Sequence, residues 1–156
     1  MKRHFDDELA DLKQRILRMG ALVEGQIRQS LVALVDRDDS VANQVIQNDR
    51  QVNTMDVEID ELCLELLALH QPAARDLRFV TTAMKISTEL ERMSDLAENI
   101  CERTIELHAE PQLKPYIDIP LMAERAIKMV AEALDAFVRG DSVLAREVLN
   151  EDDYID

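Results

Sequence analysis

Apolar side chains recur every three or four positions along most of the chain, as one face of an α-helix requires. The first such stripe runs from Phe5 through Leu12 and Met19 to Leu34. These stripes predict helices over residues 6–35, 41–70, 72–108, 121–139 and 142–156. The first three are joined by short turns at 36–40 and 71–72, so neighbouring helices must be antiparallel. The pattern therefore predicts an all-α fold that opens with an up-down-up three-helix bundle.

Residues 27–53 resemble residues 130–156 when the two segments are aligned with a shift of 103 positions. A repeat of this length is a whole supersecondary unit. The helices expected over 121–139 and 142–156 therefore correspond to the first two helices of the first unit, and a counterpart of the third is missing. The identical pairs are Leu31/Leu134, Ala33/Ala136, Val35/Val138, Asp38/Asp141, Ala42/Ala145, Val45/Val148 and Asp49/Asp152.

Residues 110–120 carry three of the four prolines, which marks them as a linker in a chain otherwise poor in turn residues. We expect a first three-helix bundle over residues 1–109, a linker over 110–120, and the first two helices of a second bundle over 121–156. The chain is then a shortened form of a two-unit protein. Two helices without a third must expose apolar surface or borrow a cover, so we expect a homodimer.

The charge balance limits the classes of partner that the protein can bind. Its 32 acidic and 18 basic residues give a net charge of −14. Such a chain has no basic surplus for nucleic acid phosphates or for direct contact with an anionic membrane surface. It suits cations, or a partner with a basic patch. No apolar run approaches about 20 residues, and the two cysteines lie within helical pattern. We expect a cytoplasmic protein that reaches a membrane only indirectly.

Two acidic stripes lie beside the apolar faces of the second and third predicted helices. Residues four apart on a helix have Cβ atoms about 6 Å apart, so two carboxylates there can hold one cation. Oxygen ligands suit magnesium, manganese, calcium or iron. The alternative is that the stripes are solvated flanks, neutralised in part by Arg50, Arg92 and Arg103. The stripe residues are Asp49, Asn53, Asp56 and Asp60 on one helix, and Glu91, Asp95, Glu98 and Glu102 on the next.

Other chemistry lacks support in the sequence. Cys63 and His70 are seven residues apart, as are Cys101 and His108, so each pair is separated by roughly 10 Å and cannot share one zinc ion. The Glu-x-x-His pattern of ferritin-like di-iron sites is absent at both histidines. Phosphate loops, nucleophile elbows and dinucleotide fingerprints are absent too, so we predict no catalytic residues and no enzyme activity.

Three strings, in this order, resemble the signatures of the PhoU family of phosphate-uptake regulators. The first is DRQVNTMDVEIDE at residues 49–61, and the second is QPAARDLR at residues 71–78. The third is Lys85-Ile86 followed by ELERMSDLAENI at residues 89–100. The resemblance covers essentially the whole chain, and it departs from the family where Ser94 replaces the usual glycine.

The resemblance implies a fold of two similar three-helix bundles in tandem, in a cytoplasmic protein that is not an enzyme. Family members associate with the phosphate ABC transporter, here through its ATP-binding subunit, and with its sensor histidine kinase. They repress the phosphate-starvation response when phosphate is plentiful. This chain lacks the third helix of the second unit, which would carry a second acidic motif.

The family also implies metal sites, because some members bind metal clusters through a Glu/Asp-x-x-x-Asp pattern. Iron, zinc, manganese or magnesium would be the metal, and a metal-binding scaffold or metal store is the alternative function. The pattern falls on Glu91/Asp95 and Asp56/Asp60, with Asp49/Asn53 and Asp152/Asp156 at related stripe positions.

Overall fold

A computed structural model describes residues 2–155, and it is built from helices throughout. No strand occurs in these residues, so the predicted all-α class is confirmed. The helices are α1 (Lys2–Asp36), α2 (Asp39–His70), α3 (Ala74–Leu107), α4 (Asp118–Arg139) and α5 (Ser142–Glu151), with a short 3-10 helix, η1 (Asp152–Tyr154), at the end.

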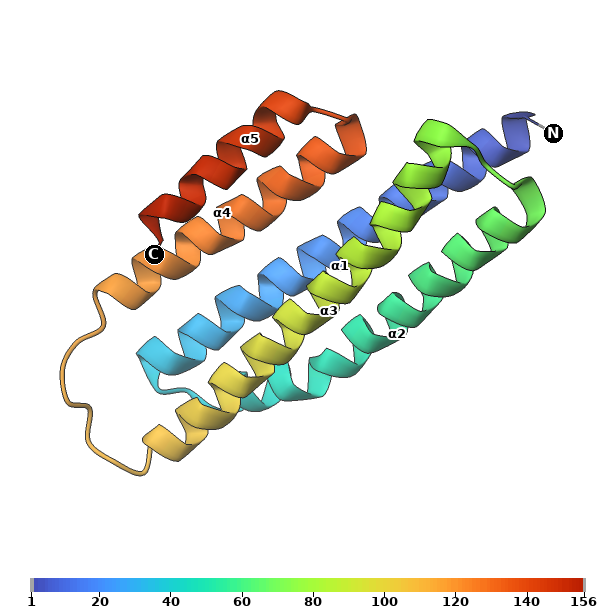
Figure 1. The fold of residues 1–156 in the computed structure, drawn as a ribbon. Coiled ribbons are helices and arrows are strands. Elements are labelled where there is room, and N and C mark those ends of the chain that lie inside the picture. Colours follow the sequence, from blue (N-terminus) through green and yellow to red (C-terminus); the bar gives the residue numbers. More distant parts are fainter. Residues whose placement is uncertain (1, 156) are drawn as a thin grey trace.

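The first three helices form the predicted up-down-up bundle, in which each helix contacts the other two (Figure 1). Its core is aliphatic and fully enclosed, and burial of each such side chain contributes about 1.5–3 kcal/mol relative to exposure. The largest enclosed side chains of this core are Leu12, Ile16, Met19, Val23, Val52, Ile59, Leu66, Val80 and Leu90.

The repeat is visible in how two helices begin. The Asp38 carboxylate accepts hydrogen bonds from the backbone N–H groups of Ser40 and Val41 at the start of α2. Asp141, its counterpart after the shift of 103, caps α5 in the same way. Both aspartates satisfy backbone donors that the first turn of a helix leaves free. Gly140 adopts φ 70° at the end of α4, the left-handed cap that a glycine permits without strain.

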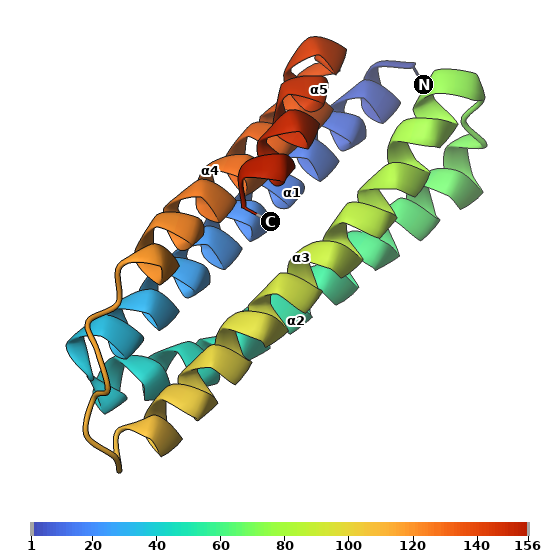
Figure 2. The same ribbon diagram turned by 60° about the vertical axis from the view of Figure 1, so that its left-hand side comes forward.

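Helix α4 lies along α1, so part of the apolar face of the second unit is buried against the first unit (Figures 1 and 2). Gly20 of α1 permits this approach. A Cβ atom there would lie 2.1 Å from Cδ1 of the buried Leu134 of α4. The contact is extended by Phe137 of α4, whose ring stacks on Phe79 of α3 with centroids 4.6 Å apart.

The rest of the second unit has little cover. Helix α5 contacts only α4 and η1 among the described elements. Ile119 and Met122 are 44% and 45% exposed, although Ile16 and Met19, their counterparts in the first unit, are fully buried. In the first unit α1 packs against both α2 and α3, whereas among the described elements α4 packs against α1 and α5, and α5 has 10 residues where α2 has 32.

Several predicted helix boundaries and core positions need correction. Helix α3 begins at Ala74 rather than 72, α4 begins at Asp118 rather than 121, and α5 gives way to η1 at Asp152. The apolar periodicity of residues 72–108 also predicts Ile100 and Leu107 on the core face of this helix, but these side chains are 43% and 52% exposed. Small residues replace them in the core, because α3 packs closely on two helices. The buried α3 residues are Val80, Ala83, Ser87, Leu90, Ser94, Ala97, Cys101 and Thr104.

Within residues 2–155, no helix is both long enough and apolar enough to cross a bilayer.

Candidate functional site

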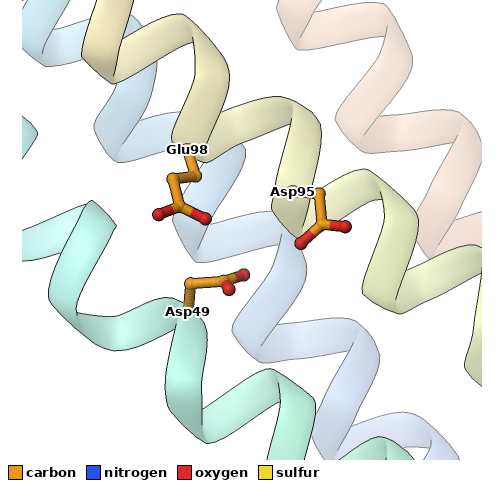
Figure 3. A group of neighbouring side chains, drawn as sticks. All are labelled: Asp49, Asp95 and Glu98. Atoms are coloured by element: carbon orange, nitrogen blue, oxygen red, sulfur yellow. The ribbon is translucent and has the colours of Figure 1, made fainter.

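Three carboxylates from two helices converge on one point between α2 and α3. Asp49 comes from α2, and Asp95 and Glu98 come from successive turns of α3 (Figure 3). One oxygen from each carboxylate lies within 4.8 Å of one oxygen from each of the others. Asp49 is buried, and the other two are half-buried. The arrangement is an acidic cluster that opens to solvent on one side.

Asp49 is held in place by two neighbours. The buried Ser94 hydroxyl of α3 donates a hydrogen bond of 2.8 Å to Asp49 Oδ1. Asn53, one turn further along α2, donates from Nδ2 to the other oxygen at 3.0 Å. A buried carboxylate needs such donors because burial without them is costly. Each Asp49 oxygen thus accepts one of these hydrogen bonds, and a carboxylate oxygen has a second lone pair for another donor or a cation.

Two further acids extend the cluster along the helices. Ser87 of α3 donates a hydrogen bond of 2.5 Å to Asp56 Oδ1. Burial raises the pKa of Glu91, and the charges of Asp95, Asp56 and Asp49 raise it further. Burial also raises the pKa of Glu98, followed by the charges of Asp49 and Glu102. Both carboxyl groups are therefore harder to ionise than usual, first because burial removes water and then because neighbouring carboxylates repel a further negative charge.

Basic side chains do not neutralise the cluster. Among residues 2–155, no lysine, arginine or histidine forms an ion pair with Asp49, Asp95 or Glu98. Arg103, one of the arginines expected to do so, bonds Glu106 instead at 2.8 Å.

The donor set fits a cation held by oxygen atoms. Around a central ion with bonds of about 2.0–2.6 Å, neighbouring oxygens are roughly 3–4 Å apart. The three carboxylates can reach such spacings from separations within 4.8 Å by small side-chain rotations. An all-carboxylate set favours magnesium, manganese, calcium or iron over zinc, which prefers nitrogen and sulfur ligands.

The structure brings together some of the predicted ligands and separates others. Asp49 and Asp95 lie in the cluster, and Glu91 and Asp56 lie beside it. Asn53 supports Asp49 as a donor. Asp60 is exposed and outside the group, one turn beyond Asp56.

The two C-terminal candidates are not part of this group. Asp152 is exposed on η1, which contacts only α5 among the described elements. Asp156 lies outside the described residues.

Sequence reasoning placed Glu98 on the acidic stripe of α3 but did not include it among the ligands. The signal was its spacing: Glu98 follows Asp95 by three residues and Glu91 by seven, which puts all three on one face. Ser94 was noted only as a departure from the usual glycine. Its buried hydroxyl is the group that orients Asp49, and only the packing of α3 on α2 could indicate this.

Comparison with known proteins agrees with the fold and the signature strings. The PhoU domain profile matches residues 16–104 and 119–156. The chain is 39% identical over 149 residues to the phosphate-specific transport system accessory protein PhoU homolog of Aquifex aeolicus, covering 96% of this chain and 67% of that protein. It is 40% identical over 157 residues to the PhoU homolog of Pseudomonas aeruginosa, covering 100% of this chain and 65% of that protein.

Two crystal structures of similar fold extend the comparison. PhoU from Pseudomonas aeruginosa superposes with a TM-score of 0.91 at 40% identity, covering 96% of this chain and 72% of that one. The phosphate transport system regulatory protein PhoU from Streptococcus pneumoniae superposes with a TM-score of 0.88 at 31% identity, covering 97% and 72%. The chain spans about two thirds of the length of these curated relatives, and it belongs to the PhoU family.

Proposed function

We propose that this protein regulates phosphate homeostasis as an accessory of a phosphate-specific transport system, and that it does so by protein contact rather than by catalysis. The observation that carries the proposal is the match of fold and sequence together. The chain superposes on a PhoU crystal structure with a TM-score of 0.91 at 40% identity. Relatives at similar identity are named phosphate-specific transport system accessory proteins.

In the finer form of this proposal, the protein bridges the ATP-binding subunit of the phosphate ABC transporter and the sensor histidine kinase. It lowers both phosphate uptake and starvation signalling when phosphate is abundant. A net charge of −14 favours partners with basic patches and disfavours direct contact with an anionic leaflet. The protein then acts from the cytoplasm and reaches the membrane through its partners.

The test has a binding part and a cellular part. The purified chain is used as bait for the two purified partners, at low and at raised salt. It is also expressed in a strain that lacks its own PhoU protein and carries a reporter of phosphate starvation. We expect capture of both partners, weaker capture at raised salt, and repression of the reporter in rich phosphate. Capture of neither partner together with an unrepressed reporter would refute the proposal.

A second candidate function is metal binding by the acidic cluster, either as part of regulation or as a metal store. The observation in its favour is that Asp49, Asp95 and Glu98 converge without a basic partner in the described residues. We expect the protein purified without chelator to carry magnesium, manganese, calcium or iron rather than zinc, measured by elemental analysis. Asp95→Ala/Glu98→Ala should lose that metal, whereas Asp60→Ala should retain it. Metal-free wild-type protein, or equal metal in both variants, would exclude the site.

We further propose that the chain forms a homodimer through the uncovered face of its second unit. The supporting observation is the exposure of Ile119 and Met122, whose counterparts in the first unit are buried. Apolar side chains grouped on one face favour association. Light scattering of the wild type should give a dimer, and Ile119→Glu/Met122→Glu should give a monomer. A monodisperse wild-type monomer would contradict this part of the proposal.

A further inference from the structure

A cavity of about 440 Å³ lies where the first half of α1, the beginning of α3 and the end of α4 meet. Its lining is basic, although the chain as a whole has a net charge of −14. Lys13 comes from α1, Arg75 and Arg78 come from the first two turns of α3, and Arg139 comes from the last turn of α4. Asp76 is the one acid in the lining. Four cations from three helices thus face one space in a strongly acidic protein.

Most of these cations are free to bind a ligand. Arg139 is paired with Asp135 at 2.9 Å, one turn earlier on α4. Across the part of the chain that the structure describes, Lys13, Arg75 and Arg78 form no ion pair. Unpaired guanidinium groups are the side chains best suited to phosphate, because their planar donors can bond two oxygens at once.

The beginning of α3 contributes partial positive charge from its backbone, and the Asp76 carboxylate in the same turn offsets part of it. Arg75 lies in the first turn of α3, where the leading N–H groups of the helix point outward. Ala73, the residue before α3, offers no side-chain acceptor to those groups. At Gly140, a Cβ atom would lie 3.5 Å from Nη2 of Arg75, so this guanidinium extends across to the end of α4.

The rest of the lining is mainly apolar. Phe79 and Phe137 stack with their planes 5° apart, and the Lys13 ammonium lies 5.2 Å from the Phe79 centroid. Leu9 and Val138 complete this part. A bare inorganic anion would use the cations and leave the apolar part in contact with water. A ligand that carries both a phosphate and an apolar or aromatic group would use both.

We propose that this cavity binds a phosphate-bearing organic anion of nucleotide size, held by Arg75 and Arg78 with Lys13 and placed against the apolar side chains of α1, α3 and α4. A volume of about 440 Å³ is in the range of small-molecule sites. The cavity is separate from the acidic cluster, because Arg75 and Asp95 are 20 residues apart on α3, on the order of 30 Å at the rise of an α-helix. The inference does not depend on the regulatory function proposed above.

The test is calorimetric titration of the full chain with ADP and ATP, with inorganic phosphate and with adenosine. Chelator is present throughout, so that metal at the acidic cluster cannot hold the phosphate. We expect ADP and ATP to bind with a Kd below about 1 mM, inorganic phosphate to bind more weakly, and adenosine not to bind measurably. Binding should weaken as salt is raised, since the cations are at the surface.

Two double variants, each of which removes two positive charges, test whether the ligand binds in this cavity. Arg75→Gln/Arg78→Gln should weaken ADP binding by about tenfold or more, because it removes both unpaired guanidinium groups. Lys114→Gln/Arg146→Gln removes the same charge at exposed positions outside the cavity and should change the Kd by less than about twofold. Circular dichroism of both variants should match the wild type, since none of the four side chains is buried.

Three results would overturn the proposal: no binding of ADP or ATP to the wild type, equal binding by Arg75→Gln/Arg78→Gln, or an equal loss in the control variant. Inorganic phosphate binding as tightly as ADP would refute the role given to the apolar side chains.

Discussion

Replacing Asp49 by asparagine should make the metal-free protein more stable, although it alters a buried and hydrogen-bonded residue. Asparagine has nearly the same shape as aspartate and keeps an oxygen to accept the 2.8 Å bond from Ser94. The exposed Asn53 amide can turn so that its oxygen faces the new NH₂ group. The principal change is therefore the loss of one negative charge from a cluster of acids.

The magnitude follows from the geometry of the cluster. Two unit charges 4.8 Å apart repel by about 1 kcal/mol at the dielectric constant of water, and by about 3.5 kcal/mol at an effective value of 20. Asp49 has two such neighbours, Asp95 and Glu98. Solvent on the open side screens both repulsions, and a weaker bond from Ser94 costs about 1 kcal/mol. We expect a net gain of about 1–3 kcal/mol in the free energy of unfolding, or about 2–12 °C in Tm.

The assay is thermal unfolding by circular dichroism at pH 7, with chelator and then with excess Mn²⁺. A metal that binds only the folded state at 100 times its Kd stabilises it by about 2.7 kcal/mol. The wild type should therefore gain stability from Mn²⁺, and Asp49→Asn should gain much less. Asp60→Asn is the matched control, because it makes the same change on the same helix at an exposed position outside the cluster. It should stay within about 0.5 kcal/mol of the wild type and keep the Mn²⁺ response.

A lower free energy of unfolding for Asp49→Asn than for the wild type in chelator would refute this prediction. That result would mean that the carboxylate is worth more as a hydrogen-bond acceptor than its repulsion costs. An equal gain from Mn²⁺ in Asp49→Asn and the wild type would show that the metal, if bound, uses other residues.

Three further predictions concern packing, pH and thiol chemistry. Gly20→Ala should stabilise the protein by less than the roughly 1 kcal/mol that alanine gains over glycine inside a helix, or destabilise it slightly, because its Cβ would lie 2.1 Å from Leu134 Cδ1 and that side chain must change rotamer. In urea unfolding, Gly20→Ala/Leu134→Ala should be at least about 0.5 kcal/mol more stable than the sum of the two single effects predicts, and simple additivity would argue against the contact. Burial, and then the charge of Asp49, raises the pKa of Glu98 in the folded protein. The stability that the protonated Glu98 contributes is therefore present below the unfolded pKa of about 4.3 and is lost as pH rises through the folded pKa. The free energy of unfolding of the metal-free wild type, relative to Glu98→Gln, should fall across that pH range, and a constant difference would contradict the shift. Burial, and then the charge of Asp60, raises the pKa of Cys63 to about 12. A thiol reagent at pH 8 should therefore modify Cys63 only as fast as the chain unfolds, and fast labelling of the native protein would refute this.

Much of the fold could be predicted because the spacing of apolar residues along a helix shows which of its faces is buried. Apolar spacing gave the helices, and Asp38 and Asp141 marked two of their beginnings. The errors arose where periodicity allows neighbouring faces. On α3, large apolar side chains such as Ile100 face solvent, while Ser87 and Ser94 lie inside. Close packing against two helices favours small side chains at the contact, and hydrophobicity alone does not report that requirement.

The candidate site shows the same division. The acidic stripes beside the apolar faces of two helices could be predicted from the amino-acid sequence, because spacings of three and four put side chains on one side of a helix whatever surrounds it. Which of these acids meet is set by the packing of the folded chain, because it depends on how α2 and α3 are rotated and shifted against each other. Their packing brings Asp49 to Asp95 and Glu98 and leaves Asp60 in solvent. The packing also places four cationic side chains of an acidic chain around one cavity. Local sequence patterns could not predict this, because they do not show which helices contact each other.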